Sequence, residues 1–278
     1  MRLNLPAIAF LLAMLGAWPA DAQRSGAPAI ETKTRAAVVT VTIDKSLDND
    51  PALVADLTAE GRSFVAKSRA EADAEHKDNP AYFRGGRRYT YERVYEFRSL
   101  IANRYLGIVR SDGTFTGGAH PNSRSDTILW DRTQNKRISV RPFFNETADN
   151  GPTMTALAAL VRRAITIERQ ERREGPRNES ERKQFLATLD ETIAKDEQLR
   201  NTIQPRLLKL GPISLAPSMT GGKSSGLTFH FSPYDVDAYA AGPYTMFVPW
   251  TDLKPYLSAE GAAIFAGVRP KKDEDKEP

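Results

Sequence analysis

Cysteine is absent from this chain of 278 residues, so the protein contains no disulfide bond and no cysteine to which a lipid anchor could be attached. Its stability must therefore come from a hydrophobic core. Hydrophobic residues make up 40% of the sequence, which is enough for a sizeable core. The length allows one domain or two, and we expect two lobes.

Histidine is scarce, and the common catalytic motifs are missing. The three histidines, His76, His120 and His230, form no HExxH or HxxxH pair, which argues against a metal site on a helix. No GxSxG nucleophile elbow occurs, and no glycine-rich phosphate loop follows a strand and opens a helix. We therefore predict no metal, no cofactor and no catalytic residue. His230 is expected to be a surface or cross-strand residue.

The chain also lacks a strong charge of one sign. Its 39 basic and 35 acidic residues are interspersed and give a net charge of +4, so no nucleic-acid partner is predicted. A basic run at residues 169–177 could bind an anion, but it alternates with glutamate. That alternation favours a solvated helix end, in which Glu168 and Arg172 are spaced to pair.

Long apolar runs are lacking except at the N-terminus. Arg2 precedes an apolar run over residues 7–18, and Ala20-Asp21-Ala22 fits a small-x-small cleavage site. Residues 1–22 are thus interpreted as a secretory signal peptide, with a mature chain that starts at Gln23 and lies in the periplasm or outside the cell. The alternative is an uncleaved anchor, although the run is short against the ~20 residues that span a bilayer. No transmembrane segment is predicted in the mature chain.

Residues 34–150 have the pattern of an N-terminal α+β lobe that follows a polar leader. Residues 34–44 alternate as a strand, with Ala37, Val39, Val41 and Ile43 on one face. Asp50 should cap a helix that runs from Pro51 to about residue 75. An antiparallel meander follows, with strands expected at 89–97, 100–109, 128–130 and 138–143, a turn at 111–113 and a hairpin tip at 134–136. Tyr89, Tyr91, Tyr95 and Phe97 are expected to share one strand face.

Residues 151–260 have the pattern of a second α+β lobe. Apolar residues at helical spacing follow Gly151-Pro152, Gly175-Pro176 breaks that helix, and Asn178 with Glu181 forms a capping box for the next. Residues 226–257 then read as strand, helical turn, strand and short helix, the last capped by Thr251 or Asp252. The charged residues 269–278 are expected to be a disordered tail. The predicted fold class is α+β, with antiparallel sheets packed by helices in two lobes.

Several of these residues resemble a known family. Residues 229–234, 239–243, 248–249 and 253–257 are similar in order and spacing to the C-terminal domain of unknown function shared by RsiV, a bacterial anti-sigma factor that senses lysozyme, and PdaC, a peptidoglycan deacetylase. Residues 116–120, TGGAH, resemble a motif in the N-terminal domain that accompanies it, although Pro121 stands where relatives commonly have glycine. The resemblance implies a fold and names no reaction.

The most conspicuous candidate site is this TGGAH segment. Gly117 and Gly118 allow a tight loop that could bring His120 or backbone amides toward a ligand. The alternative is that these residues only shape a turn. The tyrosines of the second lobe, Tyr234, Tyr239 and Tyr244, complete the set of predicted binding residues.

Two functions from different classes follow. The first is an exported, non-catalytic binding or sensing module of the cell envelope, whose partner would be a lysozyme-like wall hydrolase or a peptidoglycan fragment, as the resemblance to RsiV implies. The second is a cell-wall carbohydrate deacetylase or hydrolase, as the association with PdaC suggests. The paired histidines and aspartate that a PdaC-type deacetylase needs are not found, which favours the binding module.

Overall fold

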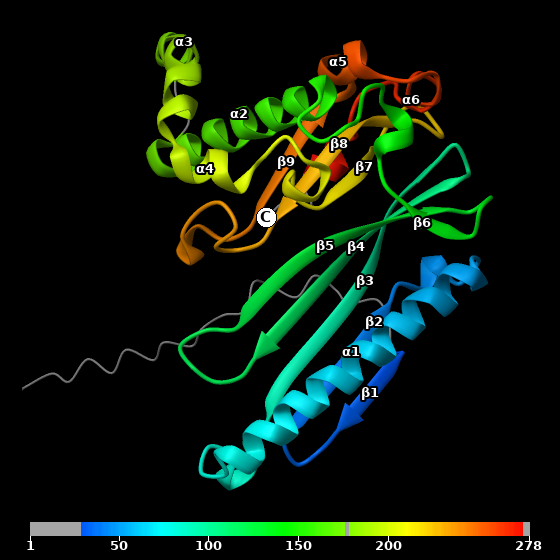
Figure 1. Ribbon diagram of the computed structural model, residues 1–278, viewed down its shortest axis with the longest axis vertical. Coiled ribbons are helices and arrows are strands. Elements are labelled where there is room, and N and C mark those ends of the chain that lie inside the picture. Colours follow the sequence, from blue (N-terminus) through cyan, green and yellow to red (C-terminus); the bar gives the residue numbers. More distant parts are fainter. Residues whose placement is uncertain (1–28, 176–177, 275–278) are drawn as a thin grey trace, which may run out of the picture.

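The computed structural model describes residues 29–175 and 178–274 (Figure 1). The predicted signal peptide and Gln23 lie outside the described residues, as do residues 275–278 of the predicted tail. The strands form two sheets, and helices pack against them, so the predicted α+β class is confirmed. Within the described residues, no helix is both long enough and apolar enough to cross a membrane.

The first sheet has six strands in the order β1-β2-β3-β4-β5-β6. Neighbouring strands are antiparallel except for β2 and β3, which are parallel, so the sheet is mixed rather than purely antiparallel. The parallel pair is possible because helix α1 carries the chain back along the sheet between these strands. The strands are β1 Ile30–Lys33, β2 Ala37–Ile43, β3 Tyr89–Ile101, β4 Tyr105–Phe115, β5 Asn122–Asp131 and β6 Lys136–Ile138.

Helix α1, Pro51–Asp78, covers one face of this sheet (Figure 1). Its buried residues repeat at helical spacing and include Leu53, Leu57 and Gly61. A Cβ atom on Gly61 would lie 2.9 Å from Val41 Cγ1, so the glycine lets the helix approach β2 closely. Asp50 precedes the helix as predicted, but its side chain makes no capping hydrogen bond and instead accepts one from Arg132 Nε at 2.6 Å.

Three predictions for the strands of this sheet were wrong. The strand predicted at 100–109 spans the β3–β4 hairpin, which turns at Ala102 and Asn103, both with positive φ. The turn predicted at 111–113 lies inside β4, where Arg93 of β3 holds Asp112 through two hydrogen bonds. Phe97 is 39% exposed and is therefore not buried with Tyr89, Tyr91 and Tyr95; the pairing shifts register just beyond it, between Phe97 and Ser99.

Two further segments differ at the ends of the sheet. The polar leader contains the edge strand β1, which pairs with β2. The strand predicted at 138–143 stops after β6, and Arg141–Phe143 form a 3-10 helix. The predicted hairpin tip is confirmed in the turn between β5 and β6, where Asn135 has a positive φ.

The second lobe has three antiparallel strands in the order β7-β8-β9. The capping box of Asn178 and Glu181 is confirmed, with the Glu181 amide 3.0 Å from Asn178 Oδ1 and the Asn178 amide 3.1 Å from Glu181 Oε2. The short helix after β9 starts behind Pro249 rather than at Thr251 or Asp252. The elements are β7 Ile213–Pro217, β8 Ser224–Phe231, β9 Tyr244–Pro249, α2 Pro152–Glu174, α3 Glu179–Lys195, α4 Glu197–Thr202, α5 Trp250–Leu253, α6 Ala259–Ile264 and α7 Lys271–Glu274.

Two hydrophobic cores hold these layers together. One lies between α1 and the first sheet. The other is centred on α2 and the second sheet, and it also takes in Ile101, Tyr105 and Leu129 from the far end of the first sheet. Ser99 Oγ of β3 donates to Leu215 O of β7 at 2.7 Å, which ties the two sheets together directly. The first sheet therefore contributes to both cores.

The segment after residue 268 is ordered in its first part. Arg269 and Asp273 are only 7% and 6% exposed, and Asp273 accepts hydrogen bonds from Arg269 and from Arg98 of β3. The prediction of a disordered tail is therefore wrong for residues 269–273, because a carboxylate in this segment satisfies two guanidinium groups of the core.

Candidate functional site

The structure brings three of the predicted binding residues together at the junction of the two lobes. The imidazole of His120, in the loop between β4 and β5, stacks on the Tyr239 ring with centroids 3.7 Å apart and planes inclined by 19°. Tyr234 lies 5.3 Å from Tyr239 and 6.5 Å from His120, centroid to centroid. We call His120, Tyr234 and Tyr239 the aromatic cluster. It joins a loop of the first lobe to the turn that follows β8.

The β4–β5 loop is shaped by the two glycines that the sequence singles out. Gly117 and Gly118 have φ values of +94° and +100°, a region that favours glycine. A Cβ on Gly117 would also lie 2.9 Å from the Tyr82 ring, whereas the space beside Gly118 is open. The Tyr239 hydroxyl donates to Pro121 O at 2.8 Å, and this contact fixes the end of the loop against the second lobe.

Tyr234 is held in an unusual position. The turn that contains it is closed by Asp235, whose backbone amide donates to Ser232 O at 3.0 Å and whose carboxylate accepts from Ser232 N at 2.7 Å. Inside this turn Tyr234 has a φ of +74° and a side chain in solvent, 60% exposed. A left-handed backbone costs a residue other than glycine about 1–2 kcal/mol. The fold therefore displays this ring at a cost in stability.

Tyr244 takes no part in the aromatic cluster. It is 1% exposed, and its hydroxyl donates to Asp237 Oδ2 at 2.8 Å. Burial, with the hydrogen bond to Asp237, raises the pKa of Tyr244 to about 12. The Arg172 guanidinium lies over its ring at 4.0 Å from the centroid and donates to Ala241 O at 2.7 Å. Tyr244 is thus a core residue that anchors the turn carrying Tyr239.

The basic run at the end of α2 has partners within the protein. Arg172 pairs with Glu168 at 2.7 Å as predicted, Arg169 pairs with Asp196 at 2.6 Å, and Arg173 lies 3.3 Å from Asp237. These ion pairs connect α2 to α4 and to the turn before β9. Residues 176–177 of the run lie outside the described residues.

The nearest approach to a nucleophile and base is a contact between β7 and β8. His230 Nε2 lies 2.8 Å from Ser214 Oγ, so the expectation of a cross-strand histidine is confirmed. Burial, together with the positive charges of Arg98 and Arg269, lowers the pKa of His230 to about 3. Ser214 is only 3% exposed and lines neither of the two cavities described below, so a substrate has no route to its hydroxyl in this structure. The contact therefore holds a serine oxygen and an imidazole nitrogen at the distance that nucleophilic catalysis uses, but a substrate has no access to them.

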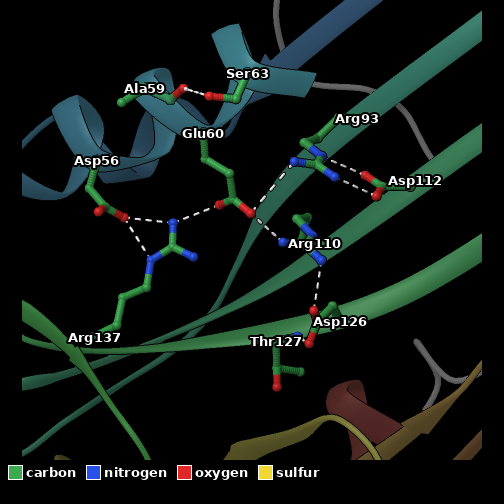
Figure 2. Close-up of polar contacts among 10 residues, drawn as sticks. All are labelled: Asp56, Ala59, Glu60, Ser63, Arg93, Arg110, Asp112, Asp126, Thr127 and Arg137. Carbon is green, nitrogen blue, oxygen red and sulfur yellow. Dashed lines mark hydrogen bonds and ion pairs between the residues drawn. The ribbon is translucent and has the colours of Figure 1, made fainter. Parts of the chain in front are cut away.

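A network of charged groups lies between α1 and the first sheet (Figure 2). Arg93 donates to both Asp112 oxygens at 2.6 Å, and Arg110 donates to Asp126 at 2.7 Å. Glu60 of α1 accepts from Arg110 and from Arg137, the latter at 2.6 Å. Burial alone would raise the pKa of Glu60, but the hydrogen bond and charge of Arg137, with the charges of Arg110 and Arg93, lower it overall. Each charge in this network is therefore compensated.

Two of the cavities among the described residues, similar in volume, are large enough for a small ligand. The first, of about 530 Å³, lies between β5 and the segment that leads into β7, and Arg124, Lys209 and Asp235 are among its lining residues. The second, of about 520 Å³, lies between α1 and strands β3 to β5, beside the charged network. Neither Ser214 nor His230 lines either cavity. Across the described residues, no group of three or more histidine and carboxylate side chains is arranged to hold a metal ion.

Comparison with known proteins gives a match for the second lobe. Solved structures that resemble the chain include a DUF3298 family member from Bacteroides fragilis NCTC 9343, with 16% identity, coverage of 74% of this chain and 70% of that one, and a TM-score of 0.43. A DUF3298 family protein from Pseudomonas aeruginosa PAO1 has 15% identity, coverage of 88% and 92%, and a TM-score of 0.42. No curated protein matches the chain. Residues 147–251, which include Tyr234 and Tyr239, match the profile of a family described as "Protein of unknown function (DUF3298)".

Proposed function

We propose that this protein is an exported, non-catalytic binding or sensing module of the bacterial cell envelope. The observation that carries the proposal is the aromatic cluster, in which side chains of two lobes meet and one ring projects into solvent. Tyrosine is enriched at recognition surfaces because its ring supplies contact area while its hydroxyl remains hydrogen-bonded. A strained backbone that keeps Tyr234 exposed has no evident benefit for the fold, which supports a role in binding.

The partner follows from the resemblance to RsiV and PdaC together with this surface. It is a lysozyme-like wall hydrolase or a peptidoglycan fragment. Both are molecules of the cell envelope, and both would meet a protein that is exported. The resemblance covers the TGGAH loop and the strand-turn-strand segment, which are the two parts of the chain that supply the aromatic cluster.

The alternative, a carbohydrate deacetylase or hydrolase, finds less support. An enzyme of this kind would need a metal site or an accessible nucleophile near a base. The Ser214 hydroxyl is buried and the Ser214 and His230 contact lies outside both cavities, so the structure offers no route for a substrate to it. Turnover of a peptidoglycan or chitin substrate that depends on His120 or His230 would favour the enzyme.

Binding is tested with the chain that starts at Gln23, immobilised and titrated with hen lysozyme and, separately, with soluble peptidoglycan fragments. We expect saturable binding of one of these, weakened by about tenfold in Tyr234→Ala, since an exposed aromatic anchor typically contributes more than 1 kcal/mol. Met219→Ala is the control, because Met219 is 75% exposed and lies outside the aromatic cluster. Equal affinity of wild type and Tyr234→Ala, or no binding of either probe, would contradict the proposal.

A comparison of Tyr234→Gly with Tyr234→Ala separates backbone strain from side-chain contacts. Both variants lose the ring, but only glycine relieves the positive φ of +74°. We expect Tyr234→Gly to be the more stable of the two by about 1 kcal/mol, and both to bind weakly. Equal stability of the two variants would show that the positive φ carries no cost.

His120→Ala distinguishes a binding loop from a structural one. If the stack on Tyr239 serves recognition, affinity falls while the melting temperature changes by only a few degrees, because an aromatic pair contributes about 0.5–1.5 kcal/mol. If His120→Ala loses much stability but binds the partner with the affinity of the wild type, the loop serves only to hold the lobes together.

Export is tested separately by mass spectrometry of protein recovered from the native cell envelope. The expected chain starts at Gln23, because Ala20-Asp21-Ala22 fits the cleavage site of a signal peptide. Recovery of the chain with Met1 in the membrane fraction would indicate an uncleaved anchor instead.

A further inference from the structure

The cavity between α1 and strands β3 to β5, which we call the helix–sheet cavity, is a second candidate site separate from the aromatic cluster. It has a volume of about 520 Å³, within the usual range of ligand pockets. Its floor is the face of β3 that carries Tyr91 and Arg93, and one wall is the side of α1 that carries Glu60 and Phe64. Figure 2 shows Glu60 of α1 facing Arg93 of the sheet, which is bonded to Asp112.

Arg93 and Glu60, two of the charged residues that line this cavity, are already paired within the protein. Arg93 is bonded twice to Asp112, approaches Glu60 at 3.5 Å and lies over the Phe64 ring at 4.3 Å from the centroid. Glu60 is in turn paired with Arg110 and Arg137. A charged ligand would have to compete with these pairs, so the cavity favours a neutral one.

The feature of this cavity that points to a ligand is a buried hydroxyl group, that of Tyr91. The Tyr91 side chain is 3% exposed, and its hydroxyl oxygen has no hydrogen-bond partner among the described residues. Burying such a group without a partner is costly, so unpaired hydroxyls in native proteins call for an explanation. Tyr91 lines the helix–sheet cavity, where a ligand can supply both a donor and an acceptor.

Most of the remaining side chains that line the cavity are neutral and polar, as the Tyr91 hydroxyl is. Ser68, Thr114 and Thr116 carry hydroxyls and Asn122 carries an amide, so each has both donors and acceptors, whereas the Ser63 hydroxyl already donates to Ala59 O at 3.2 Å. Lys67 and Glu71, also in the lining, contribute opposite charges. The combination of neutral polar groups, compensated charges and two aromatic rings suits a molecule whose own surface alternates hydroxyl groups with C–H groups.

We infer that the helix–sheet cavity binds a neutral, polyhydroxylated ligand of the size of one or two sugar rings. The inference rests on the proposed function only for the choice of sugar, since the strands of peptidoglycan are built from N-acetylated amino sugars. The Tyr91 hydroxyl and the serine and threonine hydroxyls bind ligand hydroxyl groups, while the Arg93 and Asp112 pair keeps the floor of the cavity rigid.

The test is a titration with N,N′-diacetylchitobiose, a neutral disaccharide, followed by calorimetry and by NMR. Tyr91→Phe removes one hydroxyl and should weaken binding roughly fivefold to tenfold, the usual effect of a single hydrogen bond. Tyr95→Phe is the matched control, because the Tyr95 hydroxyl on the same strand is also buried and unpaired among the described residues but does not line the cavity. Neither variant should lower the melting temperature, because each removes a buried hydroxyl without a partner among the described residues.

Charged sugars of similar size test the argument from compensated charge. Chitobiose without its acetyl groups carries ammonium groups, and a disaccharide of glucuronate carries carboxylates. Both should bind more weakly than the neutral disaccharide. The inference is overturned if N,N′-diacetylchitobiose shows no saturable binding, if a charged sugar binds more tightly, or if Tyr91→Phe and Tyr95→Phe have equal effects.

The result of this test can be distinguished from the result of the test of the proposed function. Weaker disaccharide binding by Tyr91→Phe, with unchanged affinity in Tyr234→Ala, assigns the sugar to the helix–sheet cavity, whatever the aromatic cluster binds. Weaker binding by Tyr234→Ala, with unchanged affinity in Tyr91→Phe, overturns this inference and leaves the proposed binding module intact.

Discussion

Acidification should destabilise this protein through His230. Burial and the positive charges of Arg98 and Arg269 lower its pKa to about 3, and the carboxylate of Asp273 offsets this only in part. An unfolded chain leaves the same imidazole with a pKa near ~6.5. Between these two values the unfolded state holds a proton that the native state does not hold. Stability must therefore fall as the pH is lowered.

The size of the effect follows from the same two values. The contribution is fully present above a pH of ~6.5 and is lost by about 1.4 kcal/mol for each pH unit below it, until the native pKa is reached. At a pH of ~4.5 the loss amounts to about 2.7 kcal/mol. Carboxylates begin to take up protons near this pH, but their contribution cancels when the protein is compared with a variant that lacks only this imidazole. Such a loss is a large part of the stability of an ordinary domain.

The assay is urea denaturation at several pH values between ~7.5 and ~4.5, with wild type and His230→Gln compared at each. Glutamine has no titrating group, and its amide can replace Nε2 as the partner of Ser214. We expect the free energy of unfolding of the wild type to fall by about 2.7 kcal/mol more than that of the variant. Parallel pH curves for the two proteins would refute the reasoning, since they would show that His230 titrates normally in the native state.

Three further variants test the packing, each by chemical denaturation. Phe229→Ala should cost about 3–5 kcal/mol, because the side chain is fully buried and its removal leaves a cavity. Gly261→Ala should cost about 1–3 kcal/mol, since the new Cβ would lie 2.0 Å from Phe143 O unless the backbone moves. Asp273→Ala should cost about 3–5 kcal/mol, because it leaves Arg98 without its buried carboxylate; a loss near zero would show that the C-terminal segment contributes nothing to the fold.

Local patterns were the most predictable part of the fold. The alternation of Val39 and Val41 in β2 and the capping box of Asn178 and Glu181 depend on residues close in sequence, and both are found in the structure. The parallel pairing of β2 with β3 could not be predicted from such local patterns. It depends on where the chain emerges after a helix of 28 residues, and no local pattern specifies that direction.

The misplaced turn between β3 and β4 shows how tertiary contacts override turn composition. Ser111-Asp112-Gly113 has the residues that turns favour, yet Arg93 on the neighbouring strand binds Asp112 and keeps it extended. The true turn includes Ala102, which has little turn preference of its own. Its positive φ is imposed by the pairing of Ile101 with Tyr105 on either side.

The candidate site was predictable in its parts and not in its assembly. His120 and Tyr239 were each singled out by the sequence, but nothing in a single sequence pairs residues that far apart. Tyr244 was grouped with them by its proximity along the chain, although the strand alternation in β9 turns it into the core. The helix–sheet cavity did leave one signal. Arg93 shares a buried strand face with Tyr91 and Tyr95, and a charged residue on such a face requires a buried partner.

The aromatic cluster and the helix–sheet cavity share one segment, which constrains how each can be studied. Thr116 and Asn122 line the cavity at the two ends of the β4–β5 loop, while His120 within the same loop contacts the second lobe. A substitution at Gly117, whose φ is +94° and whose Cβ would meet Tyr82, would displace both sites at once. Variants at Gly117 therefore cannot assign a ligand to one site, whereas a hydroxyl removed from strand β3 or a ring removed at Tyr234 changes one site and leaves the loop in place.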